Sequence, residues 1–244
     1  MDDLKIVTGN AGENEMKGPR MNVFQRIAGI ILSPAETMKN IVEKPGVIFP
    51  ILAYGLGMLA LYLIRFPLYQ ELLKHQMELG LAKSNTQLTP EQLNSAMKIA
   101  AISGLVATPI TSLAMWIIIT AIVFGIIKLF KGQGSFKQVA SVIGYAYVIT
   151  LAYILLCLIV SFFTGKLLLD TSLANITNLV LPDLKGSFVY GIIRGIDLFV
   201  IWQYVVMAIG IVTLSKLSKS KVYSVVGLIY IASIIIAANS NRFM

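Results

Sequence analysis

Two long apolar segments, 99–127 and 139–163, constrain the fold of this chain more than any other feature. Each exceeds the roughly 20 residues that a helix rising 1.5 Å per residue needs to cross ~30 Å of bilayer hydrocarbon. The connector between them, 128–138, holds three lysines and two glycines. Short basic loops lie preferentially on the cytoplasmic side of a membrane. The pattern therefore predicts a transmembrane hairpin with a cytoplasmic basic turn.

The composition indicates a membrane protein as well. Hydrophobic residues make up 57% of the 244 residues and charged residues only 13%, whereas soluble domains carry about 25% charged residues. The net charge of +8 is dispersed over short segments beside the apolar runs, a pattern that suits anionic lipid headgroups and excludes a nucleic-acid partner. The single cysteine, Cys157, excludes an intrachain disulfide and a thiolate metal cluster. We expect no metal and no cofactor.

The predicted fold is all-α: a polytopic membrane protein with a five-helix transmembrane bundle. A disordered polar tail at 1–20 and cytoplasmic or interfacial amphipathic helices at 21–46 precede a membrane domain at 47–238, and 239–244 forms a short outer C-terminus. Lys and Arg number twelve in the pieces assigned to the inside and seven in those assigned outside. By the positive-inside rule the N-terminus is cytoplasmic and the C-terminus outside. The five spans are expected at 47–64, 99–127, 139–163, 188–214 and 222–238.

The region 21–46 has a helical period but is too short to span. Phe24, Ile27 and Ile31 recur on one face, with Arg26 on another, which is typical of a helix lying in the headgroup plane. Ser33 is expected to cap a second helix that begins at Pro34 and runs to about residue 43. Two roles stay open for these helices: a surface that contacts a partner, or a cover over the inner mouth of the bundle.

Two further helices are expected on the outer side. The sequence at Arg65 to Pro67 is expected to end the first span, and 68–83 then forms an outer amphipathic helix. Thr89 and Gln92 match a capping box, so a helix begins at Pro90 and continues into the second span.

Small residues spaced by four in the apolar segments predict close helix packing, because in lipid small side chains let backbones approach. The packing residues are Gly104, Thr108 and Ser112 in the second span, Ala140 and Gly144 in the third, and Gly191 and Gly195 in the fourth. The alternative is a polar permeation path along hydroxyl groups that can also bond their own helix carbonyls. Those hydroxyl-bearing residues are Ser103, Thr111, Thr120, Thr150 and Ser161.

Arg194 and Asp197 lie near the outer boundary of the fourth predicted span. Three residues apart on one helical face, they can pair with each other, and near the boundary an arginine can snorkel at low cost. A structural interfacial pair and a role in substrate coupling both stay open.

Two stretches resemble prokaryotic members of the Yip family, named for Ypt/Rab-interacting proteins. They are 24–37, which reads FQRIAGIILSPAET, and 134–145, which reads GSFKQVASVIGY. The resemblance covers nearly the whole chain after Met21. It implies a five-span domain with a cytoplasmic N-terminus in the bacterial cell membrane. Eukaryotic relatives associate with Rab GTPases, and some bacterial ones are thought to act beside ATP-binding-cassette exporters. The Asp-Leu-Tyr-Gly-Pro motif of eukaryotic relatives is absent here.

The leading hypothesis is a non-enzymatic adaptor or accessory subunit for a membrane partner, either an exporter, trafficking machinery or a second copy of the chain. Its candidate contact residues are Phe24, Arg26, Ile27, Lys131 and Lys137. A small solute transporter that uses Arg194, Asp197 and the hydroxyl groups is the alternative. An intramembrane enzyme ranks third, because the predicted spans hold one carboxylate, no histidine and no nucleophile with a visible base.

Overall fold

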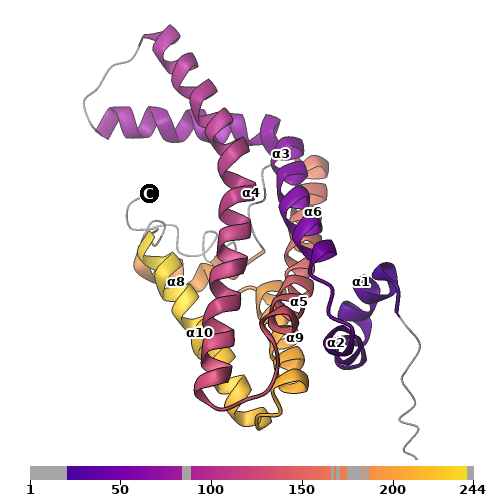
Figure 1. Cartoon of the computed structure of the whole chain (residues 1–244). Helices are drawn as coiled ribbons and strands as arrows, with labels where there is room; N and C mark the ends of the chain where they lie inside the picture. The colour runs from indigo at the N-terminus through magenta and orange to yellow at the C-terminus, as the bar shows by residue number, and fades with distance from the viewer. Residues whose placement is uncertain are drawn as a thin grey trace, which may run out of the picture.

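Five apolar helices long enough to cross a membrane form the body of the molecule (Figure 1). The computed structural model describes residues 21–83, 89–165, 168, 171–174, 184 and 187–240. The predicted polar tail at 1–20 and the last four residues lie outside this description. The structure confirms an all-α membrane protein, since the described residues form helices and no strands.

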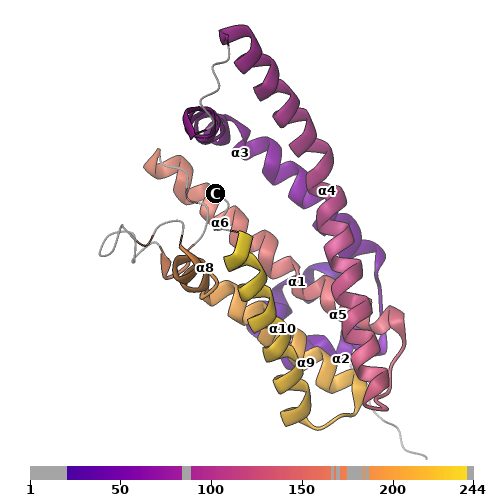
Figure 2. The same ribbon diagram turned by 90° about the vertical axis from the view of Figure 1, so that its left-hand side faces the viewer.

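Most helices begin and end close to the predicted positions in the sequence. Figures 1 and 2 show their arrangement from two sides. The two short N-terminal helices are confirmed, and the longer helices carry the five apolar stretches. Their bounds are α1 Val23–Leu32, α2 Pro34–Glu43, α3 Ile48–Lys83, α4 Pro90–Leu129, α5 Phe136–Ala146, α6 Val148–Thr164, α8 Phe188–Arg194, α9 Leu198–Ser215 and α10 Lys219–Ser240.

Helix α3 continues where an end was predicted. The prediction closed the first span at Arg65 to Pro67 and began a separate outer helix at residue 68, but α3 runs for 36 residues with Pro67 inside it. Proline removes one helical hydrogen bond and bends a helix without always ending it. Figure 1 shows the bend, beyond which the second half of α3 turns away from the bundle. Helix α4 likewise continues with Pro109 inside it, and it runs from Pro90 into the second span as expected.

The fourth predicted span is interrupted. Instead of one helix over 188–214, α8 ends at Arg194 and α9 begins at Leu198, with Asp197 as its N-cap residue. The apolar run that suggested one helix contains a capping carboxylate that starts a new one. The third span runs as one apolar stretch from Phe136 to Thr164, in which the single residue Tyr147 separates α5 from α6.

The core is built around α5 and α9, which pack against the N-terminal helices and against one side of α4 and α10. Every residue from Val139 to Ala146 of α5 is buried. Met38 and Ile41 of α2 are fully buried against this helix and α9. Large apolar side chains on α4 remain exposed on the surface that would face lipid, among them Ile99, Ile102, Ile110 and Ile117. The N-terminal helices are therefore part of the folded core.

The two basic turns meet at one end of the bundle. The Gln133 amide donates to the Ser215 carbonyl at 2.8 Å, and the Lys221 ammonium lies 4.8 Å from the centroid of the Phe130 ring. Gly134 has a φ of +110°, and a Cβ there would clash with the side chain of Leu214, so glycine is required for the turns to touch. We call this the basic end. Its described lysines are Lys39, Lys44, Lys128, Lys131, Lys137, Lys216, Lys219 and Lys221.

Candidate functional site at the basic end

The side chain of Arg26 points into the protein, although the sequence pattern placed it on the polar face of α1. It is 7% exposed. Its Nε donates to Asn40 Oδ1 at 3.1 Å and its Nη2 to the Lys44 carbonyl at 3.1 Å. Its Nη1 lies 3.4 Å from the Tyr145 hydroxyl oxygen, and the guanidinium lies 5.6 Å from the centroid of that ring. The prediction of an outward Arg26 was wrong, because these partners on α2 and α5 outweigh hydration.

The position of Arg26 depends on how α1 and α2 begin and cross. Asn22 and Gln25 form a reciprocal capping box at the start of α1, which satisfies donors that would otherwise be unpaired. At the crossing, a Cβ on Gly29 would clash with the Thr37 hydroxyl, so only glycine allows this approach. The predicted cap by Ser33 is not formed, since its side chain makes no capping hydrogen bond, while Pro34 does open α2.

Helix α5 fixes the segment that follows α2. The Gln138 side chain donates to the Val42 carbonyl at 3.0 Å. The Gly46 amide donates to the Ser141 hydroxyl at 3.2 Å. With the Arg26 contacts, these bonds anchor the C-terminal end of α2 and the segment after it. A buried charge is costly unless hydrogen bonds and nearby charge or π-density compensate it, and here neutral acceptors and one ring do so.

The opposite face of α1 is apolar and exposed. Phe24 is 81% exposed and Leu32 80% exposed, and Ile31 is exposed beside them. Ile27 is half-buried. Of the three predicted contact residues on this helix, Phe24 can therefore touch a partner directly, Ile27 only in part, and Arg26 holds the helix in place.

The two predicted contact lysines are exposed at the same end. Lys131 adopts a left-handed conformation with a φ of 58°. Lys137 lies on the first turn of α5 and lines a hollow of about 660 Å³ together with Arg26, Lys44 and Gly46. No ion-pair partner for Lys131 or Lys137 occurs among the described residues. The basic end thus combines uncompensated positive charge with the apolar face of α1.

Asp197 is the N-cap residue of α9, and both oxygens of its carboxylate accept hydrogen bonds. It is 3% exposed. Its Oδ1 accepts from the Phe199 amide at 2.8 Å and the Val200 amide at 3.3 Å. Its Oδ2 accepts from the Tyr153 hydroxyl at 3.0 Å and the Thr171 hydroxyl at 2.9 Å. The carboxylate at a helix N-terminus also interacts favourably with the helix dipole.

Arg194 and Asp197 do not share one helix, although the fourth predicted span placed both on one helical face. Arg194 is in the last turn of α8, whereas Asp197 precedes α9. The predicted relation of three residues along one helix therefore does not apply. The sequence did not single out Tyr153 and Thr171 as partners of Asp197, because they lie 44 and 26 residues away along the chain. No spacing rule connects positions that far apart.

The hydroxyl groups of the proposed permeation path mostly bond their own helices. Thr111 donates to the Ala107 carbonyl at 2.8 Å, Thr120 to Trp116 at 2.7 Å and Ser161 to Cys157 at 2.7 Å. Thr150 instead contacts the Gln203 side chain. Bonding within the helix is the ordinary way to satisfy a hydroxyl in an apolar segment.

The small residues allow close contacts, in part with the predicted hairpin partner and in part with other helices. Gly104 faces the Tyr62 hydroxyl of α3, and Gly144 lies against Pro50 of α3 and Trp116 of α4. Ala140, Gly191 and Ser112 are buried. The Thr108 hydroxyl donates to the Gly104 carbonyl at 2.6 Å. The carbonyl of Gly195 accepts from the Tyr230 hydroxyl of α10 at 2.7 Å.

In the part of the chain that the structure describes, no group of three His, Cys, Asp or Glu side chains could hold a metal.

Comparison with known proteins places the chain in a family. No curated protein and no solved structure matches the sequence. A family model for the Yip1 domain matches residues 28–238, which include α2 to α9 and nearly all of α10. This match covers most of the chain, and the chain therefore belongs to the Yip1 domain family.

Proposed function

We propose that this protein is a non-enzymatic membrane adaptor whose basic end holds a second membrane protein. The observation that carries the proposal is the rigid presentation of α1: Arg26 fixes its inner face, and Phe24 and Leu32 are exposed on its outer face. A preformed surface loses little conformational entropy on binding. The partner is a membrane protein with an apolar contact bordered by acidic groups, which would complement Lys131 and Lys137.

The transporter alternative has weaker support. Asp197 accepts four hydrogen bonds from its own chain, so binding a substrate or proton there would disrupt the start of α9. A carboxylate with these bonds is satisfied without a cation.

The proposal includes the orientation of the protein in the membrane. The basic end gathers α1, α2 and both basic turns, and by the positive-inside rule it faces the cytoplasm. The C-terminus, at the other end of α10, then lies outside. An intracellular partner would meet the exposed face of α1 on that side.

Affinity purification in mild detergent tests the adaptor role. Phe24→Ala is compared with Phe163→Ala, because Phe24 is 81% exposed and Phe163 is 88% exposed. Phe163 lies in the last turn of α6, roughly 22 Å along that helix from its start. We expect co-purifying protein to be lost with Phe24→Ala and kept with Phe163→Ala. Equal recovery from both variants contradicts the proposal.

Charge reversal provides a second test of the same surface. Lys131→Glu combined with Lys137→Glu should reduce recovery of the partner, and more so at low salt, because exposed charges act mainly over a Debye length of about 10 Å at 0.1 M salt. The control is Lys74→Glu, because Lys74 is an exposed lysine on the second half of α3. Recovery that is unchanged by the double reversal would remove the lysines from the contact.

A further inference from the structure

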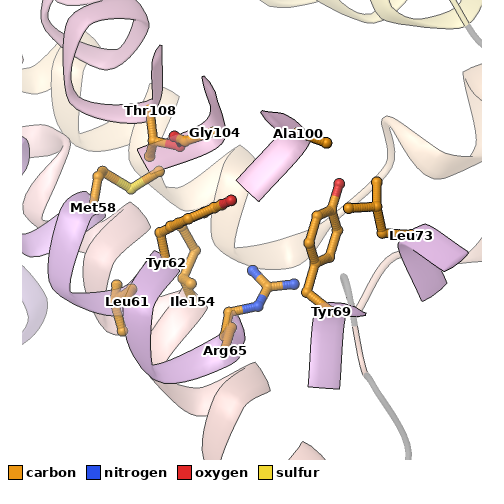
Figure 3. Close-up of a pocket in the computed structure, with 10 residues that line it drawn as sticks. All are labelled: Met58, Leu61, Tyr62, Arg65, Tyr69, Leu73, Ala100, Gly104, Thr108 and Ile154. Carbon is orange, nitrogen blue, oxygen red and sulfur yellow. Dashed lines mark hydrogen bonds between the residues drawn. The ribbon is translucent and has the colours of Figure 1, made fainter. Parts of the chain in front are cut away.

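A cavity of about 360 Å³ lies between α3, α4 and α6, at the bend of α3. Figure 3 shows its lining. On α3 the lining residues recur every three or four positions, so they share one face, and Pro67 is not among them. The α4 side is made of Ala100, Gly104 and Thr108, whose small side chains leave the space open. This volume falls within the ~300–1,000 Å³ typical of ligand sites.

Among the described residues of this lining, Arg65 carries the one charged group. Figure 3 shows its guanidinium extending between the side chains of Tyr62 and Tyr69. The described residues give Arg65 no hydrogen bond or ion pair, and none to the Tyr69 hydroxyl. The Tyr62 hydroxyl is already engaged, donating to the Ala101 carbonyl at 3.1 Å. Within the described part of the chain, the cavity therefore holds a guanidinium and a Tyr69 hydroxyl that have no hydrogen-bond partner.

The polarity of the cavity changes with depth in the membrane. The apolar stretch of α3 ends at Pro67, so Arg65 lies close to its boundary. Leu61 and Met58 are four and seven residues earlier, which places them about 6 and 10 Å further into the hydrocarbon. Thr108 and Ile154 line the deep end with them. A lipid in one leaflet has the same arrangement, with its charge at the surface and its chains toward the centre.

We propose that this cavity binds an anionic phospholipid, with the phosphate on Arg65 and an acyl chain along Met58, Leu61 and Ile154. An arginine forms strong charge-assisted hydrogen bonds to phosphate oxygens. The Tyr69 hydroxyl supplies an additional donor. The site lies at the opposite end of the bundle from the basic end, so it is independent of the proposed adaptor surface.

Native mass spectrometry of the full-length protein in detergent tests the site with three probes. Phosphatidylglycerol carries phosphate and chains, diacylglycerol with the same chains lacks the phosphate, and inorganic phosphate lacks the chains. We expect phosphatidylglycerol to bind at least about tenfold more tightly than diacylglycerol, because diacylglycerol cannot form the charge-assisted hydrogen bond to Arg65. Inorganic phosphate should neither bind nor compete. Equal binding of diacylglycerol, displacement by phosphate, or no binding by any probe overturns the proposal.

Three variants locate the binding. Arg65→Gln should weaken phosphatidylglycerol binding about tenfold and leave diacylglycerol unchanged. Lys74→Gln removes a charge nine residues further along α3, outside the cavity lining, and should change nothing. Ala100→Phe fills the cavity from the α4 side and should abolish binding of both lipids, which keeps the test decisive if Arg65→Gln unfolds. Unaltered binding in Ala100→Phe or in folded Arg65→Gln contradicts the site.

Discussion

Substituting Asn40 by leucine tests whether the buried guanidinium of Arg26 depends on its neutral acceptors. The change keeps a similar volume and removes the oxygen that accepts from Arg26 Nε at 3.1 Å. At 7% exposure the guanidinium has little access to water in its place. A hydrogen bond to a charged group contributes about 1.5–3 kcal/mol. We expect the free energy of unfolding to fall by that amount, which for a chain of this size lowers the melting temperature by about 3–12 °C.

A double-mutant cycle separates this effect from a packing effect. Arg26→Met removes the charge and keeps an apolar stem, so Arg26→Met with Asn40→Leu leaves no stranded cation. The loss in the double variant should be smaller than the sum of the single losses, because the two residues share one interaction. Thermal unfolding in mild detergent, followed by circular dichroism, measures all three. Additive losses, or a melting temperature for Asn40→Leu equal to that of the unchanged protein, would refute the reasoning.

Thr37→Val is the matched control on the same helix. Thr37 is fully buried like its neighbours on α2, and its hydroxyl has no hydrogen-bond partner in the described structure. Replacing a buried, unsatisfied hydroxyl by a methyl group of similar size removes a desolvation cost of about 1–3 kcal/mol. The melting temperature of Thr37→Val should therefore not fall.

Three further outcomes are expected. Gly29→Ala should destabilise the protein by about 1–3 kcal/mol through overpacking, and adding Thr37→Ala should recover most of the loss in thermal unfolding; no recovery would mean that the helix crossing is not the cause. Asp197→Ala removes the cap of α9 and should cost about 0.5–2 kcal/mol, and a variant that melts like the unchanged protein would argue against a structural role. Ser218 precedes α10 and Asn239 lies in its last turn, so in Ser218→Cys and Asn239→Cys variants a membrane-impermeant maleimide applied to intact cells should label only position 239, since the native Cys157 is buried; labelling at 218 would reverse the orientation.

Features of the fold that depend on local sequence could be predicted. Helix α2 begins at Pro34 and ends at Glu43, where Lys44, Pro45 and Gly46 follow. Helix α4 begins at Pro90 with the capping box of Thr89 and Gln92. Caps and prolines act within a few residues, and a span of about 20 apolar residues is required by the bilayer alone. These signals do not depend on what lies nearby in space.

The candidate site could be predicted only in part. Helical periodicity is enough to place Phe24 on the apolar face of α1, but the inward direction of Arg26 depends on Tyr145, which is 119 residues away. In a membrane protein, lipid and core are both apolar, so hydrophobic periodicity does not say which face is buried. One signal was available on α2: Asn40 interrupts a buried face formed by Met38 and Ile41, and a polar residue on such a face needs a partner.

The contact between Arg26 and Tyr145 sets a condition on how the protein is made. The first helices leave the ribosome 119 residues before their partner on α5. At about 5–20 residues per second, that interval lasts roughly 6–24 s. Throughout it, Ile30, Met38 and Ile41, which are fully buried in the finished protein, lack α5 and α9 as packing partners, although α1 and α2 already contact each other. The nascent N-terminus therefore needs a temporary shelter, on the membrane surface or on a chaperone, until the third span has been inserted.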